Sequence, residues 1–158
     1  MERSNYIEEE RIEMADTLKT PVDVKMTTNI QQQGEKDQVN LQAKGEVYQK
    51  QNFTYVNFTE NLDDIGEVST VLKVGERELT VIRSGSVSMR QRYLSGELTE
   101  GTYETPYGKL KTEAETDQVA VMWSDSGSTG RIQFGYDLTL QGTVAGRYDV
   151  TISIEEDT

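Results

Sequence analysis

The sequence predicts an all-β protein, an antiparallel meander of about eight to ten strands arranged as a barrel or a sandwich. From residue 21 onward, apolar residues recur at every second position, which is the period of a strand with one buried face. Short runs rich in Gly, Asn, Asp and Pro separate these stretches at near-regular intervals, as hairpin turns do. After residue 20 no stretch has the apolar period of a helix.

The alternating runs predict the strands in order. They cover residues 22–30, 39–47, 52–59, 68–74, 78–83, 87–93, 119–123, 132–141 and 148–154. A tight turn is predicted at residues 105–108, because Pro106 fixes φ and Gly108 is free to adopt a positive φ. Closure into a barrel removes the free edges that so many strands would otherwise present. Glycines inside or beside strands, such as Gly101 and Gly135, suit the bends that closure needs.

Residues 1–19 differ from the rest of the chain. They are rich in acidic residues and carry only a weak apolar stripe, which predicts a short helix or a disordered segment. The expected organisation is an acidic extension over residues 1–19 followed by a barrel domain over residues 20–158. A start of translation at Met14 is a second interpretation, because residues 8–11 can be encoded by purine-rich codons, as a ribosome-binding site is.

The composition excludes several classes of chemistry. The chain has no cysteine and no histidine, which excludes disulfides, zinc sites built on these residues, and mechanisms that need a Cys nucleophile or a His base. Acidic loop residues such as Asp63, Asp64 and Asp125 do not have the spacing of a calcium loop. We therefore expect no metal, no cofactor and no catalytic residue. A hydrolase or isomerase that uses carboxylates and tyrosine is the remaining enzymatic alternative.

Charge and hydropathy predict where the protein works and what it binds. The chain has 28 acidic and 16 basic residues and a net charge of -12, so we expect neither nucleic acid nor a membrane as a partner. No apolar run approaches the length of a membrane span, and the N-terminus lacks the pattern of a signal peptide. We therefore expect a cytoplasmic protein.

Three arginines lie close together in the stretch VIRSGSVSMRQRYLSGE, residues 81–97. Arg83 has the parity of the apolar residues before it, so it is predicted to point the same way as they do, whereas Arg90 and Arg92 share a face with two serines. A guanidinium can bind a carboxylate or phosphate through two parallel hydrogen bonds. The more frequent alternative is that each arginine pairs with an acidic side chain on a neighbouring strand.

Aromatic residues on the predicted strands give a second indication of a binding site. They either line a ligand cavity or, as the more frequent alternative, fill the core themselves. Our leading hypothesis is a site for a small, partly apolar or amphipathic anion, in which Arg83 and Arg92 pair with the acidic group and Tyr93, Trp123 and Tyr136 contact the body. The second hypothesis is a filled barrel that acts as a protein interaction module through its acidic surface or N-terminal segment. Composition does not indicate an oligomeric state.

Three segments, residues 81–97, 107–116 and 130–138, resemble the YwiB family of small bacterial proteins of unknown function, and the similarity extends over residues 21–155. The residues that carry it are Arg83, Ser84, Gly85, Met89, Gln91, Arg92, Tyr93, Gly96, Gly108, Leu110, Arg131 and Tyr136. The resemblance implies a closed up-and-down barrel of about eight strands with a calycin-like, or lipocalin-like, shape, and it implies no activity. The Gly-x-Trp of lipocalins is absent from the first strand, so lipocalin function is not implied. Fatty-acid-binding proteins use inward Arg and Tyr for a carboxylate, which supports the arginine site by analogy only.

Overall fold

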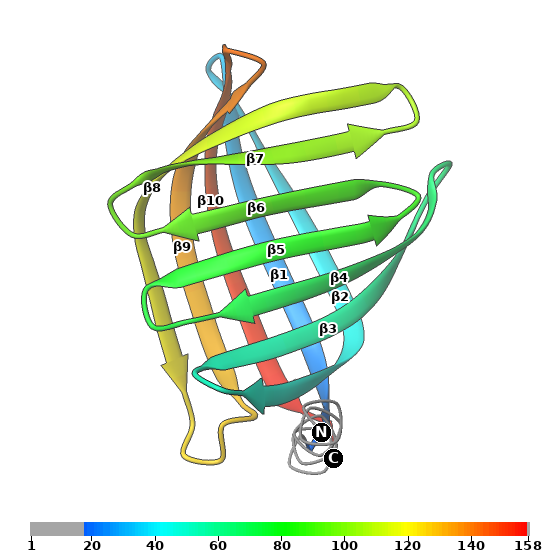
Figure 1. The fold of residues 1–158 in the computed structure, drawn as a ribbon, viewed down its shortest axis with the longest axis vertical. Coiled ribbons are helices and arrows are strands. Elements are labelled where there is room, and N and C mark those ends of the chain that lie inside the picture. The colour runs from blue at the N-terminus through cyan, green and yellow to red at the C-terminus, as the bar shows by residue number, and fades with distance from the viewer. Residues whose placement is uncertain (1–17, 158) are drawn as a thin grey trace, which may run out of the picture.

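A computed structural model describes residues 18–157 and shows ten antiparallel strands closed into one barrel (Figure 1). The strands are β1 (Thr20–Gln32), β2 (Glu35–Lys50), β3 (Phe53–Leu62), β4 (Gly66–Val74), β5 (Glu78–Gly85), β6 (Ser88–Leu94), β7 (Leu98–Thr105), β8 (Gly108–Trp123), β9 (Gly130–Leu140) and β10 (Thr143–Glu156). Each strand pairs with its neighbours in sequence, and β1 pairs with β10 to close the barrel. The predicted closed antiparallel meander is confirmed, but the count of about eight strands is wrong.

The nine alternating runs predicted from the sequence omit β7 and the first part of β8. The inward positions of β7 carry Thr99, Gly101 and Tyr103, so little apolar alternation marks this strand in the sequence. Its pairing with β8 from end to end supplies the order that its side chains do not indicate. The helical or disordered extension predicted at the N-terminus lies almost entirely outside the described residues. Within residues 18–157 there is no helix long and apolar enough to cross a membrane.

Alternation along the strands builds a packed core at the end of the barrel where β1 begins and β10 ends. Val22 and Val24 of β1 are fully buried, and Val24 lies opposite Ile154 of β10. Leu72 of β4 is also fully buried in the same cluster. Burying a side chain of this size contributes about 1.5–3 kcal/mol. The outer positions of the same strands are mostly polar, as expected for an antiparallel sheet with one solvated face.

The ladder between β2 and β3 is short. It extends only from Gly45 and Phe58 toward the hairpin that joins the two strands. Among the described residues, residues 35–44 of β2 pair only with β1, and residues 59–62 of β3 pair only with β4. In Figure 1, β3 diverges from β2 as it runs toward the right of the view. The barrel wall is therefore interrupted by a gap between these two segments.

The ladder between β6 and β7 also ends early, at Arg90, and a buried side chain continues the connection. Gln91, only 1% exposed, donates from Nε2 to the Thr99 hydroxyl at 3.1 Å and accepts at Oε1 from the Thr112 hydroxyl at 2.5 Å. Gly101 makes this possible, because a Cβ atom at that position would lie 2.4 Å from Gln91 Oε1. The glycine predicted to serve closure thus permits a close approach of strands.

Candidate functional site

The barrel contains a cavity of about 400 Å³, at the end away from the packed core. Its lining comes from β1–β6, β9 and β10 and consists of Met26, Thr28, Val39, Leu41, Phe58, Glu60, Leu62, Thr70, Val81, Arg83, Met89, Tyr93, Phe134, Tyr136, Val150 and Ile152. Val39 is 51% exposed and Tyr93 is 3% exposed, so the cavity runs from a solvent-facing rim to a buried floor. The volume is within the range of small-molecule pockets, toward its lower end.

Arg83 brings a positive charge into this mostly apolar cavity. Alternation along β5 points Arg83 inward with Leu79 and Val81, as the sequence predicted. Its Nη2 lies 3.3 Å from Oε1 of Glu60 on β3, and the two side chains are 21% and 13% exposed. The hydroxyl of Thr70 on β4 donates to the same carboxylate oxygen at 3.3 Å. The arginine is therefore paired with an acidic residue, as the alternative interpretation held, but this residue lies two strands away on β3 rather than on the neighbouring strand β4 or β6.

The Arg83 guanidinium is only partly used by this pair. A guanidinium carries five N–H donors, and the ion pair with Glu60 is a single long contact rather than a bidentate one. Arg83 Nε is buried and has no hydrogen-bond partner among the described residues. A buried donor without a partner costs free energy, so an acceptor entering the cavity would gain from meeting it.

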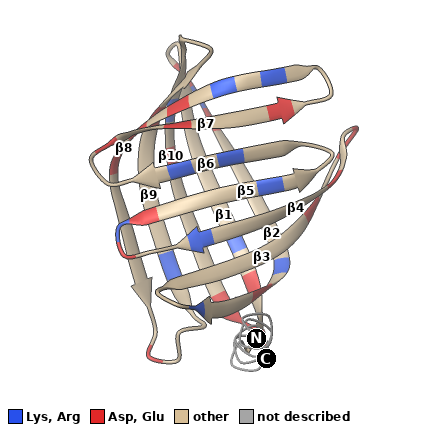
Figure 2. Cartoon of the chain, viewed as in Figure 1, with Lys and Arg blue, Asp and Glu red and all other residues tan. Residues whose placement is uncertain are grey.

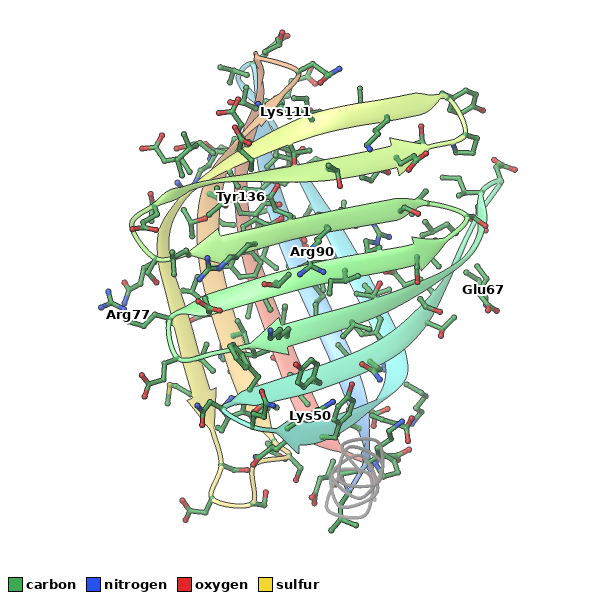
Figure 3. All side chains as sticks on the ribbon, in the orientation of Figure 1. Lys50, Glu67, Arg77, Arg90, Lys111 and Tyr136 are labelled. Carbon is green, nitrogen blue, oxygen red and sulfur yellow. The ribbon has the colours of Figure 1, made fainter. Side chains whose placement is uncertain are left out.

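Aromatic rings form the floor of the cavity. The ring of Tyr93 lies 4.8 Å from that of Phe134 and 4.5 Å from that of Tyr136, centroid to centroid, and Tyr136 stacks on Tyr148 at 5.3 Å. Tyr136, which is labelled in Figure 3, belongs to β9. The rings of Tyr93, Phe134 and Tyr136 pack on each other and also line the cavity, so both interpretations of the aromatic residues apply to them.

The two buried phenols are neutral hydrogen-bonding groups at neutral pH. Burial raises the pKa of Tyr93 well above its usual value, the nearby Tyr136 hydroxyl adds to this increase, and Arg83 opposes it. Burial raises the pKa of Tyr136 to about 12, against the opposing effect of its hydrogen bond with Tyr93. At the floor of the cavity, Tyr93 and Tyr136 therefore present neutral hydroxyl groups, and the charged group near them is the Arg83 guanidinium.

Two of the predicted site residues lie elsewhere. Arg92 is on the outer face of β6 and pairs with Glu78 at 2.6 Å. Its alternation with the inward Tyr93 places the two on opposite faces, so they cannot share a ligand inside the barrel. Trp123 ends β8 and packs over Gly130, and it does not line the cavity. The structure thus brings Arg83, Tyr93 and Tyr136 together and separates Arg92 and Trp123 from them.

Two polar residues of the site, Glu60 and Thr70, were not predicted from the sequence. The signal was present, because Glu60 has the inward parity of Val56 and Phe58, and Thr70 has that of Leu72. A charged residue at an inward position calls for a partner of opposite charge. For Glu60, the inward residue of opposite charge is Arg83.

Figure 2 shows basic residues on β4, β5, β6 and β8 across the front of the barrel and acidic residues concentrated near strand ends and turns. Of the basic residues in this view, Arg90 is labelled on β6 in Figure 3 and is exposed. Within residues 18–157 no group of three or more acidic side chains is arranged to hold a metal ion. Arg83 differs from the basic residues on the outer surface because it points inward and lines the cavity.

Comparison with known proteins assigns the chain to a family. Residues 24–152 match the family model described as a domain of unknown function, DUF1934. The chain belongs to this family. It is also 30% identical over 139 residues to the "Uncharacterized beta-barrel protein YwiB" of Bacillus subtilis (strain 168). The aligned region covers 88% of this chain and 96% of that protein.

The fold agrees with an experimental structure. The crystal structure of the ywiB protein from Bacillus subtilis superposes with a TM-score of 0.82 at 29% identity, over 92% of this chain and 98% of that one. The resemblance drawn from the sequence motifs is therefore confirmed, and the chain is a β-barrel protein of the YwiB type.

Proposed function

We propose that this chain is a non-enzymatic, calycin-like binding protein of the cytoplasm whose barrel takes a small, partly apolar anion. The observation that carries the proposal is the inward Arg83, with a buried Nε that has no partner among the described residues. Around it the cavity walls are mainly aliphatic and aromatic, which suits an apolar ligand body. Tyr93 and Tyr136 contribute neutral hydroxyl groups at the floor.

The ion pair with Glu60 defines how an anion binds. The contact is single and 3.3 Å long, so the anion takes the donors that Glu60 leaves unused, with Thr70 keeping its hydrogen bond to the carboxylate. Charge-assisted hydrogen bonds of this kind contribute about 1.5–3 kcal/mol each. Glu60 keeps the guanidinium compensated when no anion is bound, which limits the cost of a charge in an apolar cavity.

The cavity lining contains one basic residue, Arg83, and one carboxylate, Glu60. This composition argues against hydrolysis by paired carboxylates. Glu60 is the single carboxylate among the lining residues. A glycosidase-like mechanism needs two such groups on either side of the substrate. Binding without chemistry is therefore the function that this lining favours.

Isothermal titration with a panel of alkyl and aryl carboxylates, each compared with the alcohol of the same skeleton, tests the proposal. Arg83→Met should weaken binding of the carboxylates about tenfold or more and leave the alcohols unchanged. Arg92→Met is the matched control, because Arg92 lies outside the barrel. Equal binding of acids and alcohols, or equal binding by the two variants, would contradict the proposed site.

The second hypothesis, a filled barrel that serves as a protein interaction module, has less support from the interior. A cavity of about 400 Å³ has the volume of about 13 water molecules, at about 30 Å³ each. The features that favour a macromolecular contact lie instead at the gap between β2 and β3.

A further inference from the structure

The gap in the barrel wall leaves backbone hydrogen-bonding groups without strand partners. Residues 35–44 of β2 pair with β1 on one side and, among the described residues, with no strand on the other. Residues 59–62 of β3 likewise pair only with β4. Exposed strand edges of this length are normally shortened, bulged, interrupted by proline or protected by charged side chains. The β1–β2 register is continuous here, and the segment contains no proline. Its charged residues lie near its two ends, so residues 38–43 carry no charge.

The free edge of β2 is held in place by side chains as well as by the ladder. On its outer face Asn40 accepts a hydrogen bond from Thr27 at 2.9 Å and donates to Gln38 at 3.3 Å, and Gln38 donates to Asn29 at 2.8 Å. These bonds connect β2 to β1 across the surface. An added strand would therefore meet an ordered edge, which lowers the ordering cost of binding.

The same gap borders the cavity. Val39 and Leu41 of β2 and Leu62 of β3 line the cavity from the two sides of the gap, and Glu60 of β3 pairs with Arg83 inside it. Successive side chains of a strand alternate between faces. A strand added at β2 would therefore direct every second side chain into the cavity, where apolar walls and one guanidinium are available.

We propose that the ligand of this site is the C-terminal end of an extended peptide, which adds as a strand to the free edge of β2. Its inward side chains are apolar, and its terminal carboxylate reaches the unused donors of Arg83. Backbone hydrogen bonds to a sheet edge supply affinity in such complexes, and a pocket for alternate side chains supplies specificity. This inference rests on the anion site proposed at Arg83 and specifies the chemical class of its ligand.

The test uses the full chain and a library of random peptides displayed with free C-termini. We expect enrichment of peptides with alternating apolar residues. Amidation of the enriched peptides should weaken their binding about tenfold, as loss of a charge-assisted hydrogen bond does, and Arg83→Met should do the same. Circular dichroism verifies that the variant is folded, and amidation tests the carboxylate without any change to the protein.

A cross-link tests the gap directly. Gln42 and Asn61 are exposed residues on its two sides, and the chain has no cysteine of its own. The double variant Gln42→Cys and Asn61→Cys, joined by a short bis-maleimide, should lose peptide binding. The same variant with both thiols capped by N-ethylmaleimide should retain it.

Two results would overturn the inference. The first is that the wild-type protein enriches no peptides from the library beyond those that the Arg83→Met variant enriches. The second is that amidation of the peptides and cross-linking of the gap both leave peptide binding unchanged. Small carboxylates that still bind through Arg83 in that case would preserve the anion site and remove only the peptide. Loss of both would remove the site itself.

Discussion

The ion pair between Glu60 and Arg83 is predicted to couple the two residues energetically. Glu60→Gln leaves the guanidinium in the cavity without its counter-charge, whereas Arg83→Met leaves a carboxylate that still accepts the hydrogen bond from Thr70. Glu60→Gln should therefore be the more destabilising single change. The double variant should be little worse than Arg83→Met alone, because the pair is then removed as a unit.

The magnitude follows from distance and burial. At 3.3 Å the gross attraction is about 5 kcal/mol with an effective dielectric constant of about 20. Removal of one partner from a fully buried pair costs about 3–5 kcal/mol. The contact is long and single, and the side chains are 21% and 13% exposed, so we expect about 2 kcal/mol for Glu60→Gln, a decrease in Tm of about 4–8 °C.

Urea unfolding of the wild type, both single variants and the double variant measures the coupling energy. We expect about 1–2 kcal/mol for Glu60 and Arg83. The pair of Glu78 and Arg92 provides a control that separates distance from burial, since its contact is shorter, at 2.6 Å, but Arg92 is 50% exposed. Its coupling should be below about 0.5 kcal/mol. Additive effects at Glu60 and Arg83 would refute the account of a paired charge inside the barrel.

Three further predictions concern the floor, the outer face and the closure of the barrel. Because burial raises the pKa of Tyr136 from 10.0 to about 12, its contribution is complete below pH 10 and is lost as the pH rises toward 12. Roughly 3 kcal/mol of unfolding free energy should disappear over this window and Tyr136→Phe should reduce the loss, as urea titrations at stepped pH would show. Arg92→Ala should change the unfolding free energy by less than about 1 kcal/mol in the same assay. Gly101→Ala should cost about 1–3 kcal/mol, because the new methyl group would meet Gln91, and a neutral result would show that the β6–β7 connection can relax.

Period-two patterning was sufficient to predict the fold class, because most strands have one apolar and one polar face. It located the inward Arg83 through the parity of Leu79 and Val81. It could not predict β7, whose inward positions carry a single large side chain, Tyr103, beside Thr99 and Gly101, and whose order comes from pairing with β8. The number of strands depends on such pairing, which no single segment encodes.

For the candidate site, too, alternation along a strand predicts which face a side chain is on, but not its position along the barrel. Parity alone separates Arg92 from Tyr93, so their assignment to one site conflicted with the alternation that predicted the strands. Trp123 has the parity of the inward Val119 and Val121 but lies at the far end of β8, and a register shift between Thr116 and Val119 sets that position. The level of a residue along the barrel depends on register and bulges, which emerge only when the strands are paired.

Native mass spectrometry of the protein, purified gently from the cells that make it and compared with its denatured mass, shows whether the barrel carries a ligand. We expect a discrete small adduct that is lost on denaturation, absent from Arg83→Met and retained by Arg92→Met. The mass of the adduct would also distinguish a peptide from a smaller anion. A bare chain under native and denaturing conditions, or an adduct that Arg83→Met retains, would contradict binding at this cavity.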